Sequence, residues 1–287
     1  MPILKHRNPA SAPGDWYIDT ECIDCAASRI VAPGLIVRRG DLSVFGRQPE
    51  GEEDERAAWR AVLVCPTASV GRVSGGSPPA GVFPWQLAPG VFMCGYNARS
   101  SYGASSYFVT RSSGNLLIDS PRFTRKLVQA FTNAGGIAHI LLTHQDDVAD
   151  ADQYARAFGA RVWIHEHDRA AAPYAGDILT GAESASIEDG VLAIPVPGHT
   201  RGSVVYLVDY LYLFTGDSLA WDMKRGDLTA FRDACWYSWE EQTASLDRLI
   251  ARRFEWVLPG HGGFAHRPAE EMTQRLRALV RRMREVR

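Results

Sequence analysis

The sequence predicts a mixed α/β fold of the α+β type, in which a small N-terminal module precedes a larger domain. Strand and helix signals alternate between residues 123 and 164, which indicates β–α layering. The apolar runs at 204–208 and 211–214 follow each other too closely for a helix to lie between them, which favours antiparallel pairing. Four apolar runs end in turns that carry His or Asp, so polar side chains are expected just beyond strand ends.

The length, composition and charge of the chain limit the kinds of protein that it can be. With 287 residues, of which 46% are hydrophobic, the chain can form one large domain or a small domain joined to a larger one. The formal net charge is -2, and no Lys/Arg block interleaved with aromatic residues occurs in the first 230 residues. This pattern argues against nucleic-acid binding and favours a small-molecule substrate or a protein partner.

No segment indicates secretion or a membrane. The chain begins without the apolar region of a signal peptide, and no later stretch approaches the ~18 apolar residues needed to cross a bilayer. Five cysteines, an odd number in a chain of this length, do not suggest a secreted disulfide framework. We therefore expect a cytoplasmic protein that does not bind membranes.

The chain divides at a stretch rich in Gly, Ser and Pro. Cys22, Cys25 and Cys65 bracket an acidic run at 50–55 that is a candidate amphipathic helix. The composition of residues 74–89 is typical of a linker. These features predict a module over residues 1–73, a linker over 74–89 and the larger domain over 90–287.

The elements of the larger domain are predicted in chain order. A hairpin turn at 111–114 joins two strands. The predicted strands are 106–109, 115–119, 139–142, 161–164, 191–196, 204–208, 211–214 and 255–258. The predicted helices are 123–131, 150–158 with Gly159 as its stop, one that starts at a capping box at Ser238, and one opened by Pro268. The helix after Ser238 is expected to carry Leu246, Leu249, Ile250 and Phe254 on one face.

Four turns carry the candidate chemistry. His144, His199, Asp217 and His261 each come just after a predicted strand end. Since strands of one sandwich can bring such ends together, we expect these side chains to form one metal site. Imidazole and carboxylate ligands hold Zn, Fe or Mn, and these metals polarise or ionise a bound water molecule. The sequence therefore predicts metal-assisted chemistry.

The order and spacing of these motifs resemble those of the metallo-β-lactamase superfamily. The matching segments are Leu141-Leu142-Thr143-His144, Pro197-Gly198-His199-Thr200, Phe214-Thr215-Gly216-Asp217 and Leu258-Pro259-Gly260-His261-Gly262. The resemblance covers about residues 90 to 265. It implies an αββα metallo-β-lactamase sandwich that binds one or two divalent transition metals, and an activity that is usually hydrolysis.

The resemblance also implies which residues bind metal. One metal is expected on His144, Asp146 and His199, with Asp217 as a bridging carboxylate, and the other on Asp150, Asp217 and His261. Asp150 is also the candidate catalytic residue that orients the attacking water or accepts its proton. Asp146 stands where the usual motif has His, and this resembles the flavodiiron-type branch, which favours Fe or Mn over Zn.

Several alternatives remain open at this site. Ala151 takes the place of a further His ligand, so a mononuclear centre is also compatible with the sequence. Asp147 can replace Asp146 if the loop is wound differently. The run His165-Glu166-His167-Asp168 looks like a metal motif but follows the next strand. Arg201 and Trp236 are candidate substrate contacts, the first for an anionic group and the second as part of an aromatic wall.

The N-terminal cysteines resemble those of a ferredoxin-like iron–sulfur module, a small α+β unit. Its pattern is Cys-x-x-Cys-x-x-Cys with a distant Cys-Pro, matched here by Cys22, Cys25 and Cys65-Pro66. The third position is Ser28. Three thiolates can hold a three-iron cluster, or a four-iron cluster with serinate or water on one iron, but we favour a degenerate module that keeps the shape without the cluster. The first functional hypothesis is a metal-dependent hydrolase of a small molecule. The alternatives are an iron-dependent oxidoreductase fed by the module and a catalytically weak binding protein.

Overall fold

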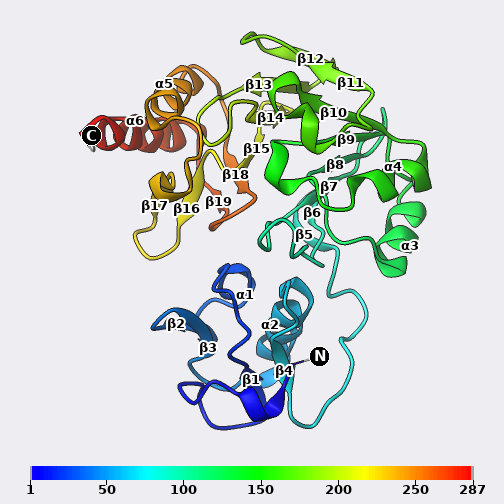
Figure 1. The fold of residues 1–287 in the computed structure, drawn as a ribbon, viewed down its shortest axis with the longest axis vertical. Coiled ribbons are helices and arrows are strands. Elements are labelled where there is room, and N and C mark those ends of the chain that lie inside the picture. The colour runs from blue at the N-terminus through cyan, green and yellow to red at the C-terminus, as the bar shows by residue number, and fades with distance from the viewer. Residues whose placement is uncertain (1, 286–287) are drawn as a thin grey trace.

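Two β-sheets pack face to face, and the burial of side chains along their strands explains this arrangement. In β14 (Val204–Val208) all five residues are buried. Val204, Tyr206 and Val208 belong to the core between the sheets, and the two residues between them belong to a second core on the opposite face. Because successive side chains of a strand point to opposite faces, such a strand must be covered on both sides. The computed structural model describes residues 2–285, which include an αββα sandwich (Figure 1).

The first sheet has seven strands, and its order is β11-β10-β9-β8-β7-β6-β5. Strands β5 to β8 pair antiparallel, whereas β8 to β11 pair in parallel. The hairpin predicted around residues 111–114 joins β7 to β8. The strands are β5 (Trp85–Ala88), β6 (Val91–Met93), β7 (Tyr107–Val109), β8 (Leu116–Ile118), β9 (His139–Leu141), β10 (Arg161–His165) and β11 (Asp177–Leu179).

The second sheet has six strands, in the order β12-β13-β14-β15-β18-β19. Strands β14 and β15 pair antiparallel, as predicted from the short connection between them, and β15 and β18 are parallel. The other strands of this sheet are β12 (Ala185–Glu188), β13 (Val191–Pro195), β15 (Tyr212–Gly216), β18 (Trp256–Pro259) and β19 (Ala265–His266). A separate hairpin is formed by β16 (Ala220–Asp222) and β17 (Asp227–Thr229).

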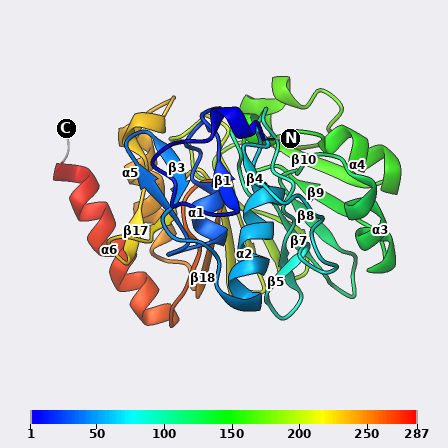
Figure 2. The same cartoon turned by 90° about the horizontal axis from the view of Figure 1, so that it is seen from below.

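Two pairs of helices cover the outer faces of the sandwich. The first sheet is covered by α3 (Arg125–Asn133) and α4 (Ala151–Phe158), and the second by α5 (Trp239–Leu249) and α6 (Ala269–Glu285). Figure 2 shows the two pairs on opposite sides of the molecule. Ser238 caps α5 as predicted, because its side chain accepts the N–H of Glu241. No helix within residues 2–285 combines the length and the apolar character needed to cross a membrane.

One helix is shorter than the sequence predicts. The expectation that Phe254 lies on the apolar face of α5 is wrong, because this helix ends at Leu249. Phe254 nevertheless joins the core beneath α5 and α6 from the segment that leads into β18. An apolar residue at helical spacing can reach the same core from the connection that follows the helix.

The N-terminal module is a small α+β unit beside the sandwich (Figure 1). Trp16 lies at its centre, with ring centroids 5.0 Å from Trp59 and 6.0 Å from Phe45. The acidic run begins helix α2, where carboxylates favour the positive end of the helix dipole. Its elements are β1 (Trp16–Ile18), α1 (Ala27–Val31), β2 (Ile36–Arg39), β3 (Leu42–Phe45), α2 (Gly51–Val64) and β4 (Val70–Arg72).

The end of the expected linker belongs to the sandwich. Residues Trp85–Ala88 form the edge strand β5, so the sheet begins before residue 90. Trp85 packs edge-on against Phe264, and the Arg60 guanidinium of α2 lies 4.3 Å from the centre of its ring. The composition of residues 74–89 does not reveal this strand, because Pro84 and Pro89 flank it closely.

Phe131 provides a test of the layer between α3 and the first sheet. It is completely buried and stacks on Phe108 with ring centroids 4.5 Å apart. We predict that Phe131→Ala lowers the free energy of unfolding by about 3–5 kcal/mol, because the variant leaves a cavity in a closely packed core. Urea denaturation measures this change. The control is Lys126→Ala on the exposed face of the same helix, and equal stability of the two variants would contradict the assigned packing.

Candidate metal centre

The sandwich brings four strand-end turns together at one edge. Asp217 directly follows β15 and His261 follows β18, and the parallel pairing of these strands places the two residues at the same end of the second sheet. His199 lies in the connection between β13 and β14 of that sheet. His144 follows β9 in the first sheet. The site therefore spans both sheets.

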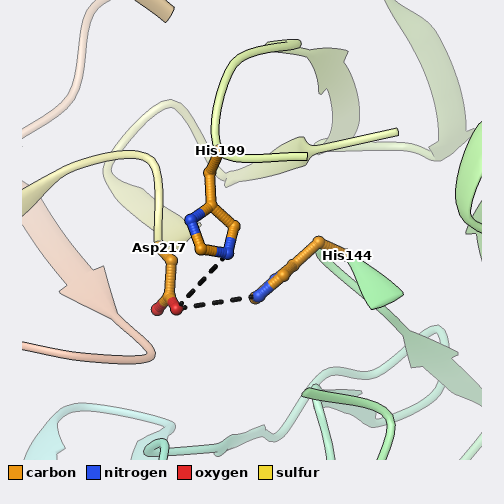
Figure 3. Close-up of side chains that lie close together, drawn as sticks. All are labelled: His144, His199 and Asp217. Carbon is orange, nitrogen blue, oxygen red and sulfur yellow. Dashed lines mark ion pairs between the residues drawn. The ribbon is translucent and has the colours of Figure 1, made fainter. Parts of the chain in front are cut away.

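The first group of potential ligands is His144, His199 and Asp217. Both histidine Nε2 atoms lie 3.7 Å from Asp217 Oδ2, and both rings point toward this carboxylate in Figure 3. The three ligand atoms lie within 4.8 Å of one another. Ligands that are each ~2.0–2.1 Å from a tetrahedral metal are roughly 3.4 Å apart. The observed spacing is therefore close to that of a metal-binding group.

Asp146 lies beside this first group, next to its two histidines. Its Oδ2 lies 3.3 Å from His199 Nε2 and 3.9 Å from His144 Nε2. The side chain keeps 43% of its surface exposed, unlike that of His144 at 1%. Hydrogen bonding to His199 holds the pKa of the Asp146 carboxyl below its usual value. Asp146 thus contributes an ionised carboxylate on the open side of the group.

A buried chain of hydrogen bonds orients His144. The backbone N–H and the hydroxyl of Thr143 donate to Asp119, which is 3% exposed and follows β8. The Thr143 hydroxyl has one proton, so its contact with His144 Nδ1 at 2.9 Å makes this ring nitrogen the donor. The proton on Nδ1 leaves the lone pair of Nε2 directed at the ligand group.

The second group of potential ligands is Asp147, Asp217 and His261. His261 Nδ1 lies 2.9 Å and 3.0 Å from the two Asp217 oxygens, and its Nε2 lies 3.4 Å from the backbone oxygen of Tyr102. Nδ1 is therefore the ring nitrogen that faces the other two residues. Asp147 is 1% exposed, and its carboxylate belongs to the same group. Asp217 is shared by both groups, as a bridging carboxylate would be.

Burial and mutual repulsion shift the protonation of these groups. Burial lowers the pKa of His144 to about 4 and raises that of Asp119 to about 7. Burial, reinforced by the Asp217 charge, raises the pKa of Asp147 well above its usual value. Burial also acts on Asp217, but His261 and the other imidazoles outweigh it and hold its pKa well below the usual value.

Unpartnered buried atoms provide an independent test of metal binding. Within residues 2–285, His144 Nε2 and both carboxylate oxygens of Asp147 are buried without a hydrogen-bond partner. Leaving such atoms unpaired costs several kcal/mol, and a coordinated cation removes this cost. These residues fit one or two divalent cations.

Comparison with known proteins agrees with this geometry. Residues 92–282 match the family model of the metallo-beta-lactamase superfamily. The chain belongs to the metallo-beta-lactamase superfamily. Residues 18–72 of this superfamily member match a second model, the 4Fe-4S single cluster domain of ferredoxin I. The αββα sandwich and the ferredoxin-like module that the sequence predicts are confirmed.

Individual relatives support the same assignment. This chain is 30% identical over 213 residues to the uncharacterized protein YobT of Bacillus subtilis. The match covers 60% of this chain and 89% of YobT. The chain is also 30% identical over 118 residues to a hydroxyacylglutathione hydrolase of Acidiphilium cryptum, covering 40% of this chain and only 48% of that protein. A crystal structure of the DIM-1 metallo-beta-lactamase exposed to ceftazidime has the same fold. Its TM-score is 0.54, its identity 16%, and the match covers 69% of this chain and 95% of the other.

The first-motif loop of this superfamily member differs from the expectation at Asp150. Asp150 belongs to neither ligand group; its Oδ2 instead accepts the N–H of Phe123 at 2.7 Å, at the position preceding α4. The short 3₁₀ turn Gln145–Asp147 buries the Asp147 carboxyl, which takes the place expected for Asp150. Ala151 lies in the core beneath α3 and α4 and supplies no ligand.

Of two further residues at the site, Asp147 was expected only as an alternative to Asp146, and Asp119 was not expected. Asp147 could not be separated from its neighbour Asp146 by sequence, because the winding of a loop decides which carboxylate points inward. Asp119 has a clearer signal: it directly follows the apolar strand β8, as the expected ligands follow theirs. Its positive φ of 54° marks the tight turn that places it under Thr143.

The candidate substrate residues lie on two sides of the His199 turn. Trp236 is 65% exposed, and its ring centroid is 6.2 Å from that of His199, so it borders the open side of the site. Arg201 instead lines a separate pocket of about 290 Å³ together with His167, Tyr237 and Glu241. The structure therefore places Trp236, but not Arg201, against the candidate ligand His199.

The module approaches the second ligand group through one loop of the sandwich. The hydroxyl of Tyr102 donates to the backbone oxygen of Ile23, between Cys22 and Cys25. Gly103 packs so closely on the module that a Cβ atom there would lie 2.9 Å from Cys25 Sγ. The backbone oxygen of Tyr102 faces His261, as described above. A single loop thus contacts both the cysteine segment and a candidate ligand.

Metal content discriminates between Asp147 and Asp150. We predict that Asp147→Asn weakens binding of the second divalent cation by roughly 10–100-fold or more, since it removes a charged ligand and even supporting partners have effects of this size. Asp150→Asn is the matched control, and its amide oxygen can still accept the N–H of Phe123. Titration of chelator-treated protein with Zn²⁺ or Mn²⁺ measures both. Loss of the second cation in the control variant alone would reverse the assignment.

Proposed function

We propose that this protein is a metal-dependent hydrolase that acts on a small molecule through an activated water molecule. The observation that carries the proposal is the convergence of two ligand groups on the shared carboxylate of Asp217. Membership of the metallo-beta-lactamase superfamily supports a hydrolytic reaction. The unpartnered atoms of His144 and Asp147 support a metal requirement.

The residues present divide between two cation positions. His144, Asp146, His199 and Asp217 would hold one cation, and Asp147, Asp217 and His261 the other. A bound divalent cation supplies Lewis acidity and lowers the pKa of water to roughly 7. The carboxylate-rich composition of both positions favours Fe or Mn over Zn.

The protein's own side chains supply orientation and proton placement. The Asp119–Thr143 pair keeps the proton of His144 on Nδ1. Asp146, which is partly exposed and ionised, is the carboxylate best placed to accept a hydrogen bond from a water molecule entering the site. This role replaces the one expected for Asp150. Trp236 offers an apolar surface for the part of the substrate next to the reacting bond.

The most informative substrate class to test is a thioester. A relative with 30% identity over 118 residues is named as a hydroxyacylglutathione hydrolase, whose substrate is a thioester. The shared segment covers less than half of that protein, so thioesters that differ in their acyl and thiol parts should be compared as substrates. Esters and lactones are the natural comparison, because the same water attack on a carbonyl carbon cleaves all three.

Substitution of one ligand tests the proposed function. We predict that His199→Ala lowers kcat/KM for S-acyl glutathione thioesters by roughly 10²–10⁴-fold, because loss of the cation removes several kcal/mol of transition-state stabilisation. His266→Ala, on the surface at β19, is the control and should retain wild-type activity. Full activity after exhaustive chelation would contradict metal dependence.

The iron–sulfur group implied by the module does not fit the residues present. Three thiols are available, and Ser28, buried at the start of α1, occupies the remaining position. Burial raises the pKa of the Cys25 thiol to about 11, and the sandwich loop at Gly103 packs directly beside it. A four-iron cluster usually takes four thiolates. We derive no electron-transfer step and propose that the module is structural.

Colour and sulfide content test the module. We predict that protein purified without oxygen contains no stoichiometric inorganic sulfide and no broad visible absorption, because the thiolate set is incomplete. Chemical assay of iron and sulfide, with an absorption spectrum, measures this. Visible absorption that disappears in Cys25→Ala would instead favour the iron-dependent oxidoreductase.

A further inference from the structure

Asp168 joins the turns that follow two of the candidate metal ligands. Its Oδ2 accepts the N–H of Gln145 at 3.0 Å and the hydroxyl of Thr200 at 2.6 Å. Its Oδ1 accepts the N–H of Gly202 at 3.1 Å. Gln145 directly follows His144, and Thr200 directly follows His199. One carboxylate, 2% exposed, therefore fastens both turns.

The topology explains why this position can bridge the sheets. Strand β10 pairs in parallel with β9, so the 3₁₀ segment after β10 begins at the same edge as the turn that carries His144. The turn that carries His199 comes from the second sheet, between β13 and β14. Within the described chain, Asp168 lies where the ends of the two sheets meet.

The contact between Asp168 and the turn after His199 requires a glycine at position 202. A Cβ atom at Gly202 would lie 2.5 Å from Asp168 Cγ, so a larger residue there would push the carboxylate away. Ser203 adds a further link, because its hydroxyl accepts the N–H of Thr200 and lies 2.9 Å from the Thr200 hydroxyl. Since Thr200 donates its proton to Asp168, the Ser203 hydroxyl donates to Thr200. Thr200, Gly202 and Ser203 thus form one hydrogen-bonded network with Asp168.

His165, three residues before Asp168, has both of its ring nitrogens bonded within the fold. His165 Nε2 lies 3.0 Å from the backbone oxygen of Gly181, and its Nδ1 accepts the N–H of His167. Both ring nitrogens of His165 are therefore used within the fold. Neither ligand group includes a residue of the His165–Asp168 run. This run, which resembles a metal motif in sequence, supports the site instead of binding metal.

We propose that Asp168 is a positioning residue that holds the His144 and His199 turns so that both Nε2 atoms converge on Asp217. The two rings lie 4.6 Å apart and nearly perpendicular, although they come from different sheets. The inference rests on the proposed metal centre, and it assigns a role to a residue outside the superfamily motifs. Removal of a supporting partner of this kind weakens metal affinity by roughly 10–100-fold.

The test compares two Asp→Asn variants. Asp168→Asn keeps the shape but replaces one acceptor oxygen with an NH₂ group, so three donors can no longer all be satisfied. Asp152→Asn, in the first turn of α4, is the matched control for the same change of charge. Affinity for Co²⁺ is measured by competition with a chelator, and the visible spectrum of the Co²⁺ protein reports ligand geometry. The imidazole ¹H–¹⁵N resonances of His144 and His199 are recorded in the metal-free proteins.

The expected result is specific to Asp168. Its variant should bind Co²⁺ roughly 10–100-fold more weakly, show an altered Co²⁺ spectrum and shift both imidazole resonances, whereas the control should match wild type. If Asp168→Asn does not fold, Thr200→Val removes the hydroxyl that bonds both Asp168 and Ser203. It should change the same quantities in the same direction by about tenfold.

The failure of this inference differs from the failure of the proposed function. Wild-type protein that takes up no Co²⁺ would overturn the metal centre, and the imidazole resonances then decide the positioning role. Unchanged affinity, spectrum and imidazole resonances in Asp168→Asn, or in Thr200→Val where that variant replaces it, would overturn the inference.

Discussion

Buried negative charge is the constraint on which the rest of the site depends. Asp119 and Asp147 are buried and the side chain of Asp217 is only 11% exposed, all within one small region, and like charges in such surroundings repel strongly. Imidazoles and hydrogen-bond donors offset part of this cost at Asp119 and Asp217, but the carboxylate of Asp147 has no such partner within residues 2–285. Keeping three acids in this arrangement lowers the stability of the sandwich, and the proposed cations would offset this loss. Such a loss of stability is common at functional sites.

The strand ends make this arrangement possible. Parallel pairing of β15 with β18 brings Asp217 beside His261, and parallel pairing of β8 with β9 brings Asp119 beneath Thr143. Each of these residues is far from its partner in sequence, yet each directly or nearly follows a strand. The sheets fix the positions of the backbone. Thr143 and the backbone oxygen of Tyr102 then accept hydrogen bonds from the rings of His144 and His261, and Asp168 accepts hydrogen bonds from the turns next to His144 and His199.

The fold, and the proximity of His144, His199 and Asp217, could be predicted from the sequence for a physical reason. Apolar runs with a polar residue at the end encode both a buried strand and the position of His144, His199, Asp217 and His261. The placement of Asp147 and Asp150 could not be predicted, because the path of the connecting loop, and not the residue type, decides which carboxylate turns inward. The hydrogen bonds of Asp168 could not be predicted either, since no sequence pattern indicates that one carboxylate accepts three donors from two distant turns.

The continuous core of this protein has a consequence for how its module unfolds. Side chains of α2 and β1, among them Trp16 and Trp59, belong to the same apolar cluster as the residues between the two sheets. Arg60 and Tyr102 add contacts across the boundary. Two units joined in this way are expected to unfold together in one cooperative transition. The module therefore contributes to the stability of the whole chain whether or not it binds a cluster.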